Sequence, residues 1–213
     1  MSFSRLQISI ILGIAVLVWY IVLHAQGTTV TLEHLAPFSS VVGALVVLSL
    51  IVENYLWRKS WLQKWFVSRP DLRGTWKVFI QSDWIDPETN KQIAPIECYM
   101  GVQQSMSNLQ MHLMTPESES WLVAHSIKPA ESGHGYQIAA LYTNKPSVNL
   151  RNNRSSMHLG ALIFETHGES ELVPENLDGE YWTDRKTTGT IVLSEKNEKL
   201  YTRFSDAQNV FRE

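Results

Sequence analysis

The sequence contains a single cysteine, Cys98, among its 213 residues. One cysteine excludes an intramolecular disulfide framework and a metal site built from several thiolates. The fold must therefore depend on a hydrophobic core, and residues 70–213 are numerous enough to bury one without covalent cross-links.

The sequence also lacks the short motifs of common enzyme classes. No G-x-S-x-G, Walker A, H-E-x-x-H or G-x-G-x-x-G pattern occurs in it. Its histidines are scattered, without i, i+4 pairing or a cysteine partner, and this does not favour a metal site. We expect a protein that is not an enzyme, with no catalytic residue, no metal ligand and no resident cofactor.

Two long stretches near the N-terminus are almost free of charge. Residues 6–23 hold no ionisable side chain over 18 positions, and residues 38–57 are apolar until Glu53 near their end. As helices, stretches of this length match the hydrocarbon thickness of a bilayer. We predict a two-helix transmembrane hairpin within residues 1–58. A signal peptide is the weaker alternative, because no cleavage site follows the first stretch and a second apolar stretch does.

The basic residues predict how such a hairpin is oriented. The loop between the two stretches has no Lys or Arg, whereas residues 57–69 carry four, in a basic and aromatic linker over residues 59–69. Basic residues favour the cytoplasmic side of a membrane. We therefore expect a multi-pass membrane protein, with the N-terminus and the C-terminal domain in the cytoplasm.

The two parts of the chain differ in net charge. Residues 1–69 carry five basic and two acidic residues, a charge of +3, and residues 70–213 carry thirteen and nineteen, a charge of −6. Proteins that bind DNA or RNA polymers gain affinity from many phosphate contacts and usually present a basic face. The acidic domain argues against such a polymer, but a small anion enclosed by one or two arginines remains compatible.

From Gly74 onward the sequence alternates with the period of β-strands. Trp76, Val78 and Ile80 share one face of the first, and short turn-rich segments separate the others. The expected strands are 74–82, 95–106, 108–115, 120–128, 135–144, 157–166, 179–185 and 187–195. Short connections favour antiparallel neighbours, so we predict a compact eight-stranded up-and-down β-barrel, with a two-sheet sandwich as the main alternative. The tail is expected to add one helical turn.

Polar and aromatic side chains recur at strand spacing in this domain. They are Thr115, Ser118 and Ser120; Tyr142 and Asn144; Arg151 and Arg154; and Tyr181, Thr183 and Arg185. Rings can stack on nucleotide bases, hydroxyls and amides can read base edges, and arginine can hold phosphate. Such residues are also normal on a solvent-facing strand surface, so the spacing leaves both interpretations open.

The order of these segments resembles one bacterial family. Two apolar stretches, a basic aromatic linker, and then "LRGTWKVFIQS", "GVQQSMSNLQMHLMTPESES", "LYTNKP", "HLGALIF" and "LDGEYWTDRKTTGTIVL" are similar to the two-transmembrane, β-strand-rich effectors of CBASS anti-phage systems. These effectors are encoded beside cyclic-nucleotide synthases of the CD-NTase type.

The resemblance implies a lipocalin-like barrel that binds a cyclic dinucleotide, assembles into homo-oligomers and disrupts the inner membrane to abort phage infection. By matching motif, it implies ligand contacts from Thr115, Ser118, Ser120, Tyr142, Asn144, Tyr181, Thr183 and Arg185, with Arg154 added from the adjoining loop. The alternative function is a membrane-tethered lipocalin-like barrel that binds an apolar small ligand.

Overall fold

The computed structural model describes residues 5–27, 32–63, 67–86, 88–148 and 157–212, with only the backbone described for residues 5–12, 14 and 32–41. The chain divides into two compact units. One comprises residues 1–57 with residues 105–108, and the other comprises residues 58–104 with residues 109–213.

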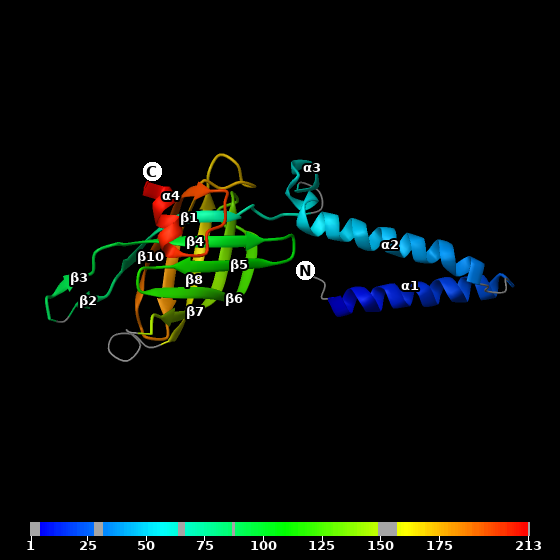
Figure 1. Ribbon diagram of the computed structural model, residues 1–213, viewed down its shortest axis with the longest axis horizontal. Helices are drawn as coiled ribbons and strands as arrows, with labels where there is room; N and C mark the ends of the chain where they lie inside the picture. The colour runs from blue at the N-terminus through cyan, green and yellow to red at the C-terminus, as the bar shows by residue number, and fades with distance from the viewer. Residues whose placement is uncertain (1–4, 28–31, 64–66, 87, 149–156, 213) are drawn as a thin grey trace. The chain divides into compact units, whose positions relative to one another are not determined.

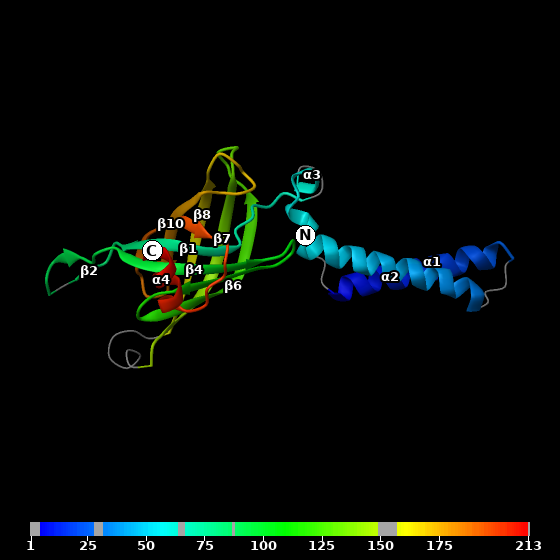
Figure 2. The same ribbon diagram turned by 45° about the horizontal axis from the view of Figure 1, so that its top comes forward.

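The first unit is built from two long helices, α1 (Arg5–Ala25) and α2 (Leu32–Asn54). They lie side by side in both ribbon views (Figure 1, Figure 2). Near the end of α2, the Glu53 carboxylate accepts hydrogen bonds from the Ser105 hydroxyl at 2.5 Å and from the Ser107 amide at 3.0 Å. The described side chains do not include those in the first part of either helix. Within the described residues, no helix is both long enough and apolar enough to cross a membrane.

The second unit is an eight-stranded antiparallel barrel (Figure 1). Its strands are β1 (Gly74–Ser82), β4 (Ile96–Gln104), β5 (Leu109–Met114), β6 (Ser118–Pro129), β7 (Tyr136–Pro146), β8 (His158–His167), β9 (Asn176–Thr183) and β10 (Thr188–Asn197). Each strand pairs with its neighbour in the chain, and β1 closes the barrel by pairing with both β4 and β10. The predicted barrel is therefore confirmed, and the sandwich alternative is wrong.

A short hairpin and three helical elements complete the described chain. A short hairpin of β2 (Ile85–Asp86) and β3 (Lys91–Gln92) forms an arm between β1 and β4, where the sequence predicted only a turn. Helix α4 (Phe204–Arg212) is longer than the single turn expected, and its Ala207 packs against Tyr99 and Met114 on the outer wall. Two short helical pieces, η1 (Leu56–Arg58) and α3 (Ser60–Gln63), precede the barrel.

The barrel interior follows from the alternation of side chains along each strand. Trp76, Val78 and Ile80 of β1 face inward, as the sequence predicted, and the first two are fully buried. They meet inward residues of the other strands, such as Phe164 of β8 and Leu193 of β10, in one hydrophobic core. Burial of this apolar surface is the main favourable contribution to folding.

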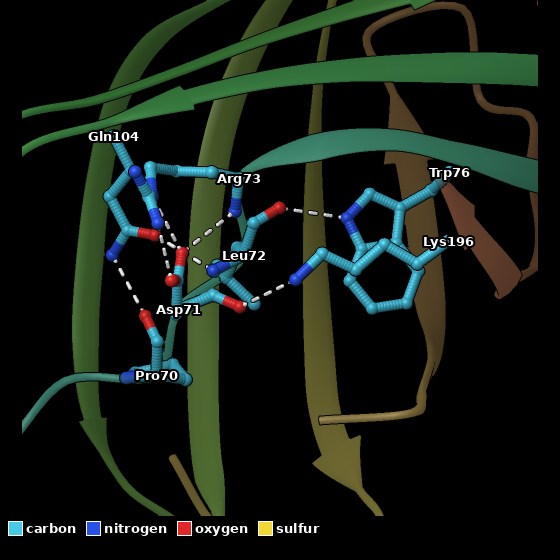
Figure 3. Close-up of polar contacts among 7 residues, drawn as sticks. All are labelled: Pro70, Asp71, Leu72, Arg73, Trp76, Gln104 and Lys196. Atoms are coloured by element: carbon cyan, nitrogen blue, oxygen red, sulfur yellow. Dashed lines mark hydrogen bonds and ion pairs between the residues drawn. The ribbon is translucent and has the colours of Figure 1, made fainter. Parts of the chain in front are cut away.

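Residues 67–73 cross one end of the barrel, which we call the base, and bond to residues of its strands. Figure 3 shows residues 70–73 with the side chains that bind them. The Trp76 indole N–H donates to the Leu72 carbonyl at 2.8 Å. The Gln104 side chain accepts from the Leu72 amide and donates to the Pro70 carbonyl, both at 2.9 Å. These bonds satisfy backbone groups that would otherwise be buried without partners, so the segment is held as a plug.

Charged side chains complete the plug. Lys196 donates to the Asp71 carbonyl at 3.1 Å, and its ammonium lies 5.2 Å from the Trp76 ring centroid. Arg73 forms a two-bond ion pair with the Asp71 carboxylate, at 2.8 and 2.7 Å. Burial alone would raise the pKa of Asp71, but Arg73 holds this pKa below its usual range.

We predict that Trp76→Ala lowers the free energy of unfolding by about 3–5 kcal/mol, because it removes a fully buried ring together with its hydrogen bond to the plug. Urea unfolding of the purified chain measures this loss. Trp182→Ala is the matched control, since Trp182 lies on the outer wall and is 44% exposed; its effect should stay within about 0.5 kcal/mol. Equal effects of the two substitutions would contradict the assigned role of Trp76.

Candidate functional site

The end of the barrel opposite the base, which we call the mouth, gathers the polar side chains that the sequence singled out. Because neighbouring strands run antiparallel, the ends of β5, β7 and β9 meet the beginnings of β6, β8 and β10 there. Thr115, Ser118, Ser120, Tyr142, Asn144, Tyr181 and Thr183 all lie at this end. Seven residues from three separate segments of the chain are thus brought together.

Ser120 and Asn144 form a buried polar pair on facing strands. They are cross-strand partners on β6 and β7, and they are 6% and 7% exposed. The Ser120 hydroxyl donates to the Asn144 side-chain oxygen at 2.9 Å. This bond orients the Asn144 amide, whose NH₂ group can donate to a ligand carbonyl.

Tyr142 and Tyr181 bring two half-buried rings to the inner wall of the mouth, where they pack against the core. Burial, with Tyr181 and Asp184 nearby, raises the pKa of Tyr142 to about 12. Burial also raises the pKa of Tyr181, although a hydrogen bond with Ser82 opposes the shift. Both phenols therefore stay protonated at neutral pH and can donate a hydrogen bond to an anion.

Thr115 and Ser118 are engaged with each other in the turn between β5 and β6. Thr115 Oγ1 accepts from the Ser118 amide at 2.8 Å and donates to the Ser118 carbonyl at 2.9 Å. The two side-chain oxygens are also 3.1 Å apart. These bonds close the turn at the rim of the mouth.

The turn between β9 and β10 departs from the sequence expectation. The strand predicted over 179–185 ends at Thr183, so Arg185 does not continue the strand face of Tyr181 and Thr183 but lies exposed in the turn. Thr183 and Thr187 hydroxyls are 2.7 Å apart, and Lys186 takes the left-handed conformation, with φ of 62°. The expected strands 179–185 and 187–195 already placed the turn at residue 186, and this turn brings two basic residues, Arg185 and Lys186, to the rim of the mouth.

The arm adds residues that the sequence reasoning missed. Asp83 accepts a 3.0 Å hydrogen bond from the Thr188 hydroxyl, and two open clefts of about 260 and 280 Å³ share these two residues. Tyr181 and Trp182 contribute to the first cleft, and Trp84 contributes to the second. The sequence carries little signal for this hairpin, because only two residues on either side of "PETN" form its strands and Lys91–Gln92 is polar at both positions.

Arg151 and Arg154 lie outside the residues that the structure describes. Across the described ranges, no three histidine, cysteine, aspartate or glutamate side chains gather as ligands for a metal ion.

Residues 67–195, more than half of the chain, match the family model described as the Cap15 cyclic dinucleotide receptor domain. The chain belongs to this family. The matched range begins in the plug and covers all eight strands of the barrel almost to the end of β10. The resemblance to CBASS effectors is thereby confirmed. A comparison with curated proteins gives no match.

We predict that Ser120→Ala lowers the free energy of unfolding by about 1–3 kcal/mol, because it leaves the buried Asn144 oxygen without its donor. Chemical denaturation of the purified chain measures the change. Ser126→Ala, at an exposed position on the same strand, is the control and should change stability by less than about 0.5 kcal/mol. A neutral Ser120→Ala would show that the pair does not stabilise the mouth.

Proposed function

We propose that this protein is a membrane effector of a CBASS system and that its barrel binds a cyclic dinucleotide at the mouth. The proposal rests on one observation. The chain folds as a barrel of a cyclic dinucleotide receptor family, and the polar and aromatic residues singled out from the sequence lie together at one end of that barrel. The other end is filled by the plug, which leaves the mouth as the side for a ligand.

The chemistry of the mouth fits such a ligand. Tyr142 and Tyr181 offer rings for base stacking, and Asn144 offers an oriented amide for a base edge. Arg185 and Lys186 at the rim can pair with phosphate oxygens. Two phosphates need only a few cations, whereas the net charge of −6 on residues 70–213 disfavours a nucleic-acid polymer.

We propose that residues 1–58 attach the protein to the inner membrane, that residues 59–69 form the juxtamembrane linker and that residues 70–213 form the receptor in the cytoplasm. The support is the absence of ionisable side chains over residues 6–23 and the exposure of large apolar side chains on α1 and α2. Leu17 and Leu48, for example, are 58% and 51% exposed. Apolar surface of this extent on a pair of helices fits a lipid environment better than water.

Signalling requires that the ligand favour one state of the protein over another. A cyclic dinucleotide made by a CD-NTase would promote homo-oligomers only if it binds the assembled state more tightly than the monomer. In the proposed sequence of events, occupancy of the mouth drives assembly, and the assembled N-terminal helices then disrupt the bilayer. The protein acts as a receptor throughout and performs no chemistry on its ligand.

We predict that Arg185→Ala weakens binding of the cognate cyclic dinucleotide at least about tenfold, since a hydrogen bond to a charged group contributes about 1.5–3 kcal/mol. Calorimetry of the purified full-length chain against cyclic di-AMP, di-GMP, GMP–AMP, di-UMP and UMP–AMP identifies the ligand and measures the loss. Arg203→Ala is the control and should bind like the wild type, since Arg203 is exposed and lies just before α4, outside the barrel strands. Binding of an apolar small molecule in place of every nucleotide would support the alternative, a barrel for an apolar ligand.

We also predict that the full-length chain stays in the membrane fraction of expressing cells after carbonate extraction. Replacing Leu17 and Leu48 by arginine should release it, because each charge costs about 2.5–3.5 kcal/mol at the centre of a membrane helix. Leu141→Arg is the control, since Leu141 is an exposed residue of the barrel wall. A wild-type chain that carbonate releases fully would refute membrane insertion.

A further inference from the structure

Two glycines of the mouth stand directly opposite the two tyrosines. Gly160 of β8 is the cross-strand partner of Tyr142 on β7, and Gly189 of β10 is the partner of Tyr181 on β9. Directly paired residues of antiparallel strands point to the same side of a sheet. Each tyrosine therefore shares the inner wall with a glycine on the next strand.

The tyrosine rings fill the space that the glycine side chains would need. A Cβ atom built on Gly160 would lie 2.2 Å from Cζ of Tyr142 and 2.3 Å from its hydroxyl oxygen. A Cβ atom on Gly189 would lie 2.1 Å from the Gln81 backbone oxygen, and then 2.8 Å from Cε1 of Tyr181 and 2.9 Å from its hydroxyl oxygen. The far end of each ring thus leans over the adjacent strand along the inner wall.

Gly160 differs from glycines that serve strand packing alone. All three atoms nearest to its added Cβ belong to the Tyr142 ring. On Gly179, by contrast, the nearest atoms belong to the backbone of Ile163 and Phe164. Glycine weakens a strand interior, and it often marks a site where another group must approach closely. At position 160 that group is the tyrosine ring.

A tyrosine ring also lies over a glycine on β9 and β10, but Gly189 is required there by the Gln81 backbone as well as by Tyr181. We propose that Gly160 is a positioning residue of the nucleotide site, which holds the Tyr142 ring flat against the inner wall so that one base of the ligand can stack on it. The proposal rests on the function proposed above. A side chain at position 160 would push the ring off the wall and into the space that a base must occupy.

Gly160→Ala tests this proposal, because the three atoms nearest to the added Cβ all belong to the far end of the Tyr142 side chain. The full-length variant is titrated calorimetrically with the tightest binder of the five cyclic dinucleotides named above, and its thermal unfolding is recorded. We expect affinity to fall about fivefold or more, the effect of losing one base–aromatic stack. Tyr142→Ala should cause a similar loss, and Tyr142→Phe, which keeps the ring, should retain most of the affinity.

The double variant Gly160→Ala with Tyr142→Ala separates positioning from an independent role. If Gly160 acts only through the ring, the double variant binds no more weakly than Tyr142→Ala, so the two losses are not additive. The double variant also lacks the steric conflict between the Cβ added at position 160 and the Tyr142 ring. Its affinity can therefore be compared with that of Tyr142→Ala even if Gly160→Ala alone does not fold. Additive losses, or wild-type affinity in Tyr142→Ala, would overturn the proposal.

Gly101→Ala is the matched control. Its Cβ would lie 2.8 Å from the Tyr201 carbonyl oxygen on the outer wall, so it introduces comparable crowding away from the mouth. It should lower thermal stability and leave affinity unchanged.

If the wild type binds none of the five nucleotides, the proposed function fails. If the wild type binds and a folded Gly160→Ala binds equally well, only the role of Gly160 fails.

Discussion

Closure of the sheet through β1 is the constraint on which the rest of the barrel depends. β1 pairs with β10 along one edge and with β4 along the other, and together these ladders join the first and last strands of the domain. Once the sheet is closed, every strand has one face toward a single enclosed core and one face outward. The register of β1 therefore decides which side of all eight strands lines the interior.

The two ends of this closed barrel have become chemically different. At the base, Trp76, Leu72 and Gln104 hold a segment of the chain across the opening with buried hydrogen bonds. At the mouth, hydroxyl and phenol groups near the strand ends remain partly accessible, next to the buried pair of Ser120 and Asn144. If the mouth binds the ligand as proposed, stability and recognition are separated along the barrel axis, because apolar packing and a plug at one end allow polar, incompletely packed side chains at the other.

The outer wall could be predicted less well than the inner wall. Tyr99 and Met114 belong to β4 and β5 and are fully buried, yet both lie on the outside beneath α4. Their burial depends on a helix about a hundred residues further along the chain, so the local pattern could not indicate it. The arm was missed for a related reason, since strands of two residues carry too little alternation to be distinguished from a turn.

The alternating pattern by itself determined the eight strands and the inward face of β1, because the side-chain period of a strand is a local property. It also singled out the polar residues from Thr115 to Thr183, but it could not bring them together or separate a polar edge from a pocket. Only the tertiary structure decided that they meet at one end, that the strand stops at Thr183 and leaves Arg185 in the turn, and that Gly160 and Gly189 stand under two tyrosine rings. Cross-strand register sets these relations, and register is fixed when the barrel closes rather than by any single segment.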